Sequence, residues 1–325
     1  MPVAGCVAAG IAGARHDVPA RAIADSDSAP ISLLMLRLRA GDSRVVVASA
    51  PNSTSKLIYH GGLAGLGTLY WENAEGLKHA AALFAAPSAE AAHELVRRWG
   101  VTHVVYFSWD PFAFTMTKLA RGLPPAAPLP ADAFIVRLLA SPVPPPWLEA
   151  VPFEIPPHSA IEGDQIRIWR VVPEQSPADA TAHAASCALE LGEAGRARQL
   201  GAALAAFPAD LNARVMAAAV AAADRNSAAF SRELERVTAL LPRASGLSLE
   251  DRLHLVVVLA VGNRLDAARS QLRLCMAAAN DSDLRHLTPG TLSDFLSLAN
   301  ALGVDFPDPA LRRLAERLLP PIRRK

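Results

Sequence analysis

Residues 70–76, with the sequence YWENAEG, combine the residue types that could hold a sugar or another polar ligand. Two carboxylates and an amide lie beside two aromatic rings, which is the mixture that small-molecule sites use. The composition is typical of a loop, where binding residues concentrate. A structural alternative is a turn in which Asn73 and Glu75 cap the next helix. The candidate ligand-binding residues are therefore Tyr70, Trp71, Glu72, Asn73 and Glu75.

Two further patterns could be mistaken for catalytic motifs. His103, with Trp109 and Asp110 nearby, could act as a base, but no Ser or Cys nucleophile motif accompanies it, and a structural histidine is favoured. Residues 61–67 (GGLAGLG) match neither the dinucleotide-binding fingerprint nor a P-loop. They predict a flexible turn or a strand edge.

The cysteines offer no metal motif. Cys6, Cys187 and Cys275 are isolated, and no Cys/His group has zinc spacing. The two later cysteines lie in apolar helical runs and are expected to be buried. We therefore predict no catalytic residue, metal site or cofactor. An enzyme that uses Glu72, Glu75 or His103 is the least favoured of three functional hypotheses.

Length and charge limit the remaining possibilities. A chain of 325 residues can form two domains, and a formal net charge of +1 gives no general attraction to nucleic acid. No run of 18 apolar residues is present, so no membrane-spanning helix is expected. Residues 1–29 are interpreted as a disordered leader or as the last turns of a membrane helix whose remainder is missing.

Residues 30–172 are expected to form a small α/β domain. Short β-branched runs predict strands over 44–49, 101–107 and 165–172. A helix is predicted over 88–100, with Ser88 as its N-cap and Gly100 as its C-cap. Strand, helix and strand with short connections indicate α/β organisation.

Residues 173–325 are expected to be all-α. All Trp and Tyr residues lie before residue 171, and the remainder is rich in Ala, Leu and Arg. Gly192 with Ala197, and Gly262 with Ala267, repeat a pattern that resembles the turn between the helices of a tetratricopeptide (TPR) repeat. The fold class is thus a mixture of α+β and all-α structure: an α/β domain, then TPR-like antiparallel helical repeats.

Eight helices in four antiparallel pairs are expected in this second domain. Four large apolar residues fall at inward helical positions and should be core: Phe207, Phe230, Leu255 and Phe295. Four arginines could line a basic groove, although a solvated face is favoured: Arg196, Arg198, Arg214 and Arg225. The expected partner of such repeats is a protein or peptide.

One stretch of the first domain resembles a known family. The segments are VVVASAPNSTSKLIYHGG and LGTLYWENAEGLKHAAALFAAPSAEAAHELVRRWGVTHVVYFSWDPF, within residues 45–112. They are similar to the soluble C-terminal region of bacterial GT-C-type membrane glycosyltransferase-like proteins, which are related in plan to oligosaccharyltransferases. The catalytic carboxylates of that family lie between membrane helices that this chain lacks, so no catalytic residue is carried over.

The resemblance implies a non-catalytic extracytoplasmic portion that positions a substrate or partner at the periplasmic face of the inner membrane. A lipid-linked sugar or glycan is then a candidate ligand, and membrane contact would come only through a missing upstream segment. The alternative is a free-standing, cytoplasmic TPR-like adaptor.

Overall fold

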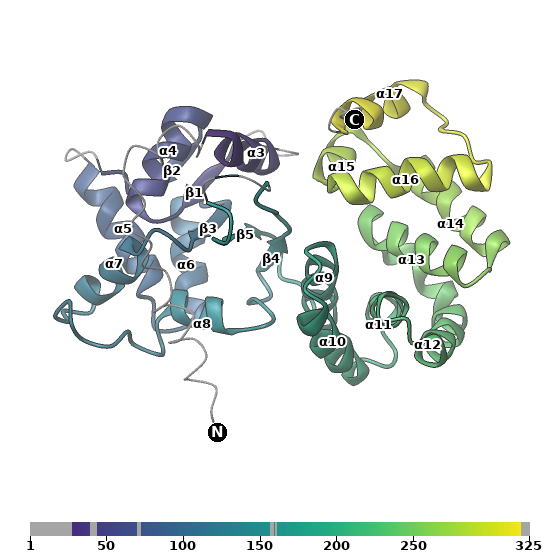
Figure 1. Ribbon diagram of the computed structural model, residues 1–325, viewed down its shortest axis with the longest axis horizontal. Helices are drawn as coiled ribbons and strands as arrows, with labels where there is room; N and C mark the ends of the chain where they lie inside the picture. Colours follow the sequence, from purple (N-terminus) through teal and green to yellow (C-terminus); the bar gives the residue numbers. More distant parts are fainter. Residues whose placement is uncertain (1–27, 40–43, 70–72, 157–158, 160, 320–325) are drawn as a thin grey trace. The chain divides into compact units, whose positions relative to one another are not determined.

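The computed structural model describes residues 28–39, 44–69, 73–156, 159 and 161–319 (Figure 1). It is a mixed α/β molecule that is rich in helix. Its contacts form two compact units, one ending at Glu174 and the other beginning at Gln175. Most of the predicted leader, up to residue 27, lies outside the described residues, and the first described helix starts at Ser28. Among the described helices, none is both long and apolar enough to cross a membrane.

The first unit is built on a five-stranded mixed sheet with the strand order β2-β1-β3-β5-β4. β1 pairs in parallel with both β2 and β3, whereas β5 runs antiparallel to β3 and to β4. The strands are β1 (Val46–Ala48), β2 (Ala64–Leu66), β3 (His103–Phe107), β4 (Leu148–Val151) and β5 (Ile166–Val171).

Helices cover both faces of this sheet (Figure 1). Successive strand residues point to opposite faces, so Val104 joins one hydrophobic cluster and Val105 joins another. The Val105 cluster contains residues of α3 (Ser28–Arg39) and α4 (Pro51–Gly61). The Val104 cluster contains residues of four helices, α5 (Ala74–Phe84), α6 (Ala89–Trp99), α7 (Phe112–Ala120) and α8 (Phe134–Ala140).

The three predicted strands are confirmed as β1, β3 and β5, with shorter bounds. The predicted helix is α6. The side chain of Ser88 accepts a hydrogen bond from the Ala91 amide at 3.1 Å, and Gly100 has a left-handed φ of 62°. The glycine-rich run contains the edge strand β2, as expected. Within β5, Trp169 points to the face opposite Ile166 and Ile168, and all three are buried because both faces of the sheet are covered.

The second unit is helical throughout its described elements. α9 packs on α10, α11 on α12, α13 on α14 and α16 on α17, and α11 also packs on α9 and α13. The helices are α9 (Pro177–Glu190), α10 (Ala194–Ala203), α11 (Leu211–Ala223), α12 (Ser227–Leu240), α13 (Leu249–Val261), α14 (Leu265–Ala278), α15 (Asp281–His286), α16 (Pro289–Leu302) and α17 (Pro309–Leu318). The short α15 makes nine described α-helices, where eight were expected.

The proposed turn motif is right at one of its two positions. Gly192 has a φ of 66° and Ala197 is buried, as expected. Gly262 has a φ of −77°, and the left-handed residue is Asn263 instead. The second turn motif was therefore placed one residue too early, and the buried small residue after this turn is Ala268. Gly262 is small for another reason: an added Cβ would lie 2.9 Å from Leu234 Cδ1 and closer still to Cδ2.

Several side-chain expectations need correction. Leu255 and Phe295 are fully buried core residues, but Phe207 and Phe230 are only partly buried. Arg214 is neither in a basic groove nor on a solvated face, since it is 1% exposed. Its guanidinium forms an ion pair with Glu233 at 3.2 Å and donates to the Leu204 carbonyl. Cys187 and Cys275 are buried, as predicted.

Candidate functional site

A pocket of about 240 Å³ in the helical unit is lined by both apolar and polar side chains. It is lined by α9, α11, α13 and α16, which are neighbours in space although not in sequence. Met216, Leu253 and Phe295 provide apolar lining. The polar lining comes from Ser186, Glu190, His254, Thr291 and Asp294.

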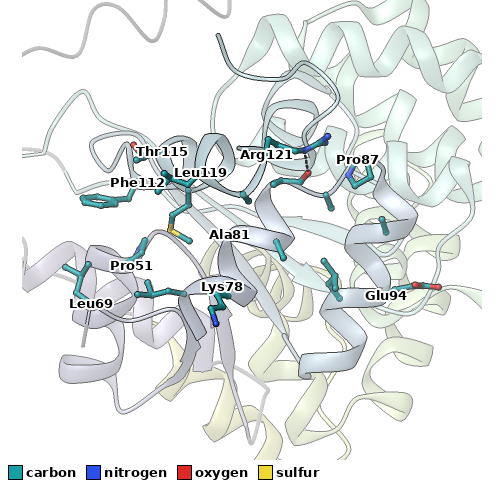
Figure 2. A pocket seen from close by; sticks show the side chains of 18 residues that line it. Pro51, Leu69, Lys78, Ala81, Pro87, Glu94, Phe112, Thr115, Leu119 and Arg121 are labelled. Carbon is teal, nitrogen blue, oxygen red and sulfur yellow. Dashed lines mark hydrogen bonds between the residues drawn. The ribbon is translucent and has the colours of Figure 1, made fainter. Parts of the chain in front are cut away.

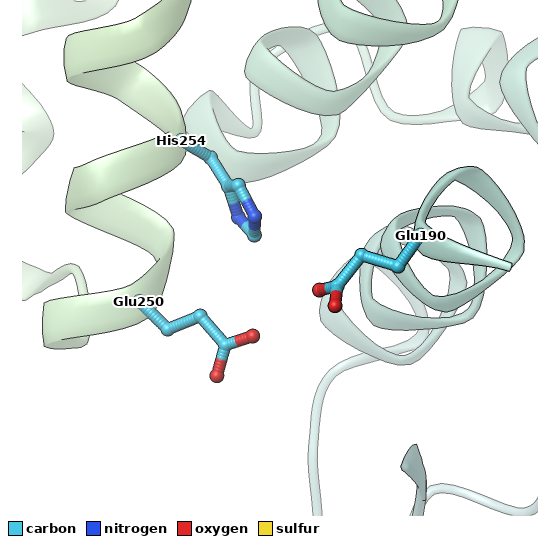
Figure 3. A group of neighbouring side chains, drawn as sticks. All are labelled: Glu190, Glu250 and His254. Atoms are coloured by element: carbon cyan, nitrogen blue, oxygen red, sulfur yellow. The ribbon is translucent and has the colours of Figure 1, made fainter. Parts of the chain in front are cut away.

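Three of the polar side chains in and beside this pocket converge. One ligand-type atom from each of Glu190, Glu250 and His254 lies within 4.8 Å of the other two. Figure 3 shows Glu250 and His254 extending from one helix towards Glu190 on another. Carboxylate oxygens and an imidazole nitrogen are the donors that a divalent metal ion uses in proteins. These three residues could therefore hold a metal ion.

Helix geometry explains why these side chains meet. The Ser248 hydroxyl caps α13 by accepting from the Asp251 amide at 3.1 Å. From this start, Glu250 and His254 are four residues apart and share one face of the helix. Glu190 is the last residue of α9, where the helix reaches the same pocket.

His254 is partly buried, and its ring has one hydrogen bond among the described residues. Its Nε2 lies 3.3 Å from Ser186 Oγ, while its Nδ1 has no hydrogen-bond partner there. Burial lowers the pKa of His254 below its usual value, although the Asp251 carboxylate opposes this. The neutral imidazole is therefore favoured near neutral pH.

A second polar contact joins α9 and α13 one turn away. His183 Nε2 lies 3.0 Å from Asp251 Oδ1, and His183 Nδ1 lies 2.6 Å from Gln175 Oε1. Burial raises the pKa of Asp251, but the hydrogen bond and charge of His183, the Ser248 hydrogen bond and the charge of His254 together outweigh burial and bring the pKa to about 2. The His183–Asp251 contact therefore fixes the two helices that carry the three converging residues.

The Ser186–His254 pair does not make a catalytic triad. A triad needs a carboxylate bonded to the second ring nitrogen, and Nδ1 has no hydrogen bond within the described chain. Cys275 is also unsuited as a nucleophile, since burial raises its pKa to about 12. The arrangement supports ligand or metal binding better than nucleophilic catalysis.

The predicted loop in the first unit is described only in part. Tyr70, Trp71 and Glu72 lie outside the described residues. Asn73 caps α5, since its side chain accepts from the Gly76 amide at 3.2 Å, and it also donates to Thr68. Glu75 lies in the first turn of α5 and pairs with Lys78 at 2.6 Å, with both side chains exposed. The capping role expected for Asn73 is confirmed.

His103 and Asp110 have structural contacts. His103 is buried in β3, with Nδ1 2.9 Å from the Thr102 hydroxyl, which confirms a structural histidine. Asp110 accepts from the Ser53 amide, the Ser53 hydroxyl and the Phe112 amide at 3.2, 2.7 and 3.2 Å. The chain leaves β1 into α4 on one face of the sheet and leaves β3 into α7 on the other face. Such a switch point between neighbouring parallel strands often binds ligands. Here the Asp110 carboxylate already occupies it.

An open groove of about 920 Å³ runs over α5, α6 and α7 (Figure 2). Its lining is largely apolar and includes three exposed large side chains, Leu69, Phe112 and Leu119. Lys78 and Arg121 lie at its border, and Arg121 donates to the Ala85 carbonyl at 2.8 Å.

Comparisons with known proteins identified no related protein. No protein-family model matches the chain, and neither a curated protein nor a solved structure matches it significantly.

The sequence contained a weak signal for the pocket that was missed. Glu250 and His254 stand four residues apart in a helical segment, which is a spacing that places both on one face. Glu190 could not be added, because no local pattern shows which distant helix packs beside α13.

Proposed function

We propose that this chain is a non-catalytic binding protein whose helical unit is a TPR-like scaffold for an extended peptide segment of a partner. The observation that carries the proposal is the pocket shared by α9, α11, α13 and α16. These are the first helices of four successive helix pairs. In TPR-like arrays such helices line the surface that binds peptides.

The pocket favours a long cationic side chain. Asp294 has no hydrogen bond or ion pair among the described residues, and burial raises the pKa of its carboxyl. A Lys or Arg side chain could lay its methylene stem on the partly exposed Val257 and Leu298 and bring its charge to Asp294. We therefore expect the partner peptide to insert a basic residue here.

Peptide selection tests this role. The purified full-length chain is used to select from a library of random displayed peptides, and selected peptides are then titrated by fluorescence anisotropy. We expect peptides enriched in Lys or Arg, with affinity reduced by about tenfold in Asp294→Asn, since charge-assisted bonds contribute about 1.5–3 kcal/mol. Glu316→Gln on α17, a partly exposed carboxylate outside the pocket, is the matched control and should bind normally. Selection without basic residues, or equal binding by Asp294→Asn, would contradict the proposal.

A second candidate role belongs to the α/β unit. We infer from its resemblance to GT-C-type proteins that this unit is an extracytoplasmic portion that positions a lipid-linked substrate at the periplasmic membrane face. The apolar groove favours this role, because Phe112 and Leu119 would contact an isoprenoid chain, and Arg121 at the border would meet a phosphate.

Titration with a short-chain polyprenyl phosphate, followed by tryptophan fluorescence, tests the groove. Leu119 and Leu36 are both highly exposed, at 65% and 67%, but only Leu119 lines the groove. Leu119→Glu should weaken binding several-fold, and Leu36→Glu should leave it unchanged. Equal binding by both variants, or none by the native chain, would exclude this role.

The cellular form separates the two roles. An antibody to the helical unit should detect a larger, membrane-bound product if a membrane segment belongs to the protein. A product near 34.3 kDa in the soluble fraction would favour the free-standing adaptor.

The enzyme hypothesis requires that Glu72→Ala or His103→Ala abolish a measured turnover. Because His103 has structural contacts, the enzyme hypothesis is the weakest of the three functional hypotheses.

A further inference from the structure

We propose that Glu190, Glu250 and His254 form a binding site for a divalent transition metal ion, with Zn²⁺ as the best fit. The site would sit at the edge of the helical pocket, formed by α9 and α13 (Figure 3). It stands on these three side chains alone and does not depend on the proposed peptide role.

The donor set determines the class of metal. Imidazole favours Zn²⁺ and other late first-row ions, whereas Mg²⁺ and Ca²⁺ prefer sites made of oxygen atoms. Tetrahedral Zn²⁺ with bonds of about 2.0–2.1 Å places its donor atoms about 3.3 Å apart. The three donor atoms already lie within 4.8 Å of one another. Small rotations of the two long Glu side chains would close the remaining difference, because each has three rotatable bonds.

Charge also favours a cation at this position. An oxygen atom of each of two carboxylates lies within 4.8 Å of the other, beside the His254 imidazole. Their mutual repulsion would be replaced by attraction to a shared divalent ion. Glu190 is exposed, so the ion would have access from solvent.

The environment of His254 suits a metal ligand. A ligating histidine usually donates its other ring N–H to an oxygen, which fixes the tautomer. The Ser186 hydroxyl is in place for this at 3.3 Å from Nε2. The lone pair then falls on Nδ1, which is buried and has no hydrogen-bond partner in the described chain. A buried, unsatisfied nitrogen is costly, and a metal bond would satisfy it.

The framework is also fixed before any metal binds. The contact between His183 and Asp251 joins the same two helices at 3.0 Å, one turn from the cluster. Ligands held on helices that are already joined need little reorganisation on binding.

Metal titration of the full-length, tag-free chain tests the site. The protein carries Cys6→Ser, is stripped with EDTA, and is titrated with Zn²⁺ by calorimetry and with Co²⁺ by visible absorption. We expect one equivalent of each ion, a cobalt spectrum without a thiolate charge-transfer band, and a raised Tm with Zn²⁺. Mg²⁺ at the same concentration should have no effect. The absence of saturable Zn²⁺ binding would overturn the proposal.

Variants identify the ligands. Glu190 is exposed, so Glu190→Gln should not disturb folding, and we expect it to weaken Zn²⁺ binding at least tenfold. His254→Ala should weaken Zn²⁺ binding further. Glu235→Gln is the matched control, a 70% exposed carboxylate on α12. If Glu190→Gln and Glu235→Gln bind Zn²⁺ equally, the three residues are not the ligands.

The outcome is separable from that of the peptide role. Asp294→Asn should lose peptide affinity and keep Zn²⁺ binding. Peptide binding without any Zn²⁺ binding would overturn the metal site and leave the scaffold proposal intact.

Discussion

Asp110 is a buried carboxylate that stabilises the starts of two helices. It accepts hydrogen bonds from Ser53 near the start of α4 and from the Phe112 amide of α7. Because Asp110→Ala leaves buried donors unsatisfied, we expect it to lower the free energy of unfolding by about 3 kcal/mol. Asp132→Ala is the control, since Asp132 is 54% exposed and pairs with Arg121, and it should cost less than about 1 kcal/mol. Urea unfolding followed by tryptophan fluorescence measures both values.

Asp251 predicts an acid-dependent loss of stability in the helical unit. Its pKa in the folded chain is about 2, below the ordinary value of 3.8. A carboxyl whose pKa is lower in the folded chain than in the unfolded chain stabilises the fold at pH values above the unfolded pKa. This stabilisation is lost as the pH falls to the pKa of the folded chain. The contribution is about 2 kcal/mol, present above pH ~4 and lost towards pH ~2.

Metal-free protein and its Asp251→Asn variant should therefore differ in stability at pH 6 and converge at low pH. Urea unfolding monitored by circular dichroism at several pH values between these limits measures the difference. A difference that stays constant with pH would show that the charge of Asp251 does not stabilise the fold.

The structural roles of single residues were the hardest feature of this molecule to predict from the sequence. The capping of α5 by Asn73 follows from residue type alone, and the sequence indicated it. The roles of Asp110, Arg214 and His254 depend on partners in other elements, which no local pattern specifies. Arg214 shows the limit clearly, because an arginine in a helical pattern is usually solvated and this one is buried against Glu233.

At the scale of elements, Gly262 explains how α13 approaches α12. Its φ of −77° suits any residue, but a Cβ there would clash with Leu234. We expect Gly262→Ala to destabilise the chain by about 1–2 kcal/mol through overpacking. Gly195→Ala in α10 is the control, since nothing lies within 4 Å of its added Cβ, and it should stabilise the chain by up to about 1 kcal/mol. Opposite signs in urea unfolding would support this packing role, and equal effects would contradict it.

Elements with strong local signals were predicted, and those that depend on distant contacts were not. α6 has both caps and an apolar face within its own sequence. β2 has three residues and no alternating pattern, and it forms because Ala64–Leu66 pairs with β1. α4 begins with the polar sequence PNSTS, and its first turn is bonded by Asp110 from another part of the chain.

At the scale of the whole molecule, the helical unit has its own hydrophobic core. This core includes Leu255 and Phe295 and draws its buried residues from α11 to α17. We expect residues 175–325, expressed alone, to be helical and to unfold in one cooperative transition. Circular dichroism during thermal unfolding measures this, with no interfering tryptophan because the last one is Trp169. A broad, non-cooperative transition would show that the helical unit needs the first unit to fold.

The two edge strands of the sheet, β2 and β4, are poor partners for a strand of a second chain. An exposed edge can pair with another chain and start a fibril. β2 has three residues and contains Gly65, while β4 is preceded by Pro144, Pro145 and Pro146 and followed by Pro152. Proline cannot donate to a growing sheet, and a short glycine-containing strand offers little to a second copy. Both ends of the sheet are therefore poor templates for amyloid growth, which protects the first unit at high concentration.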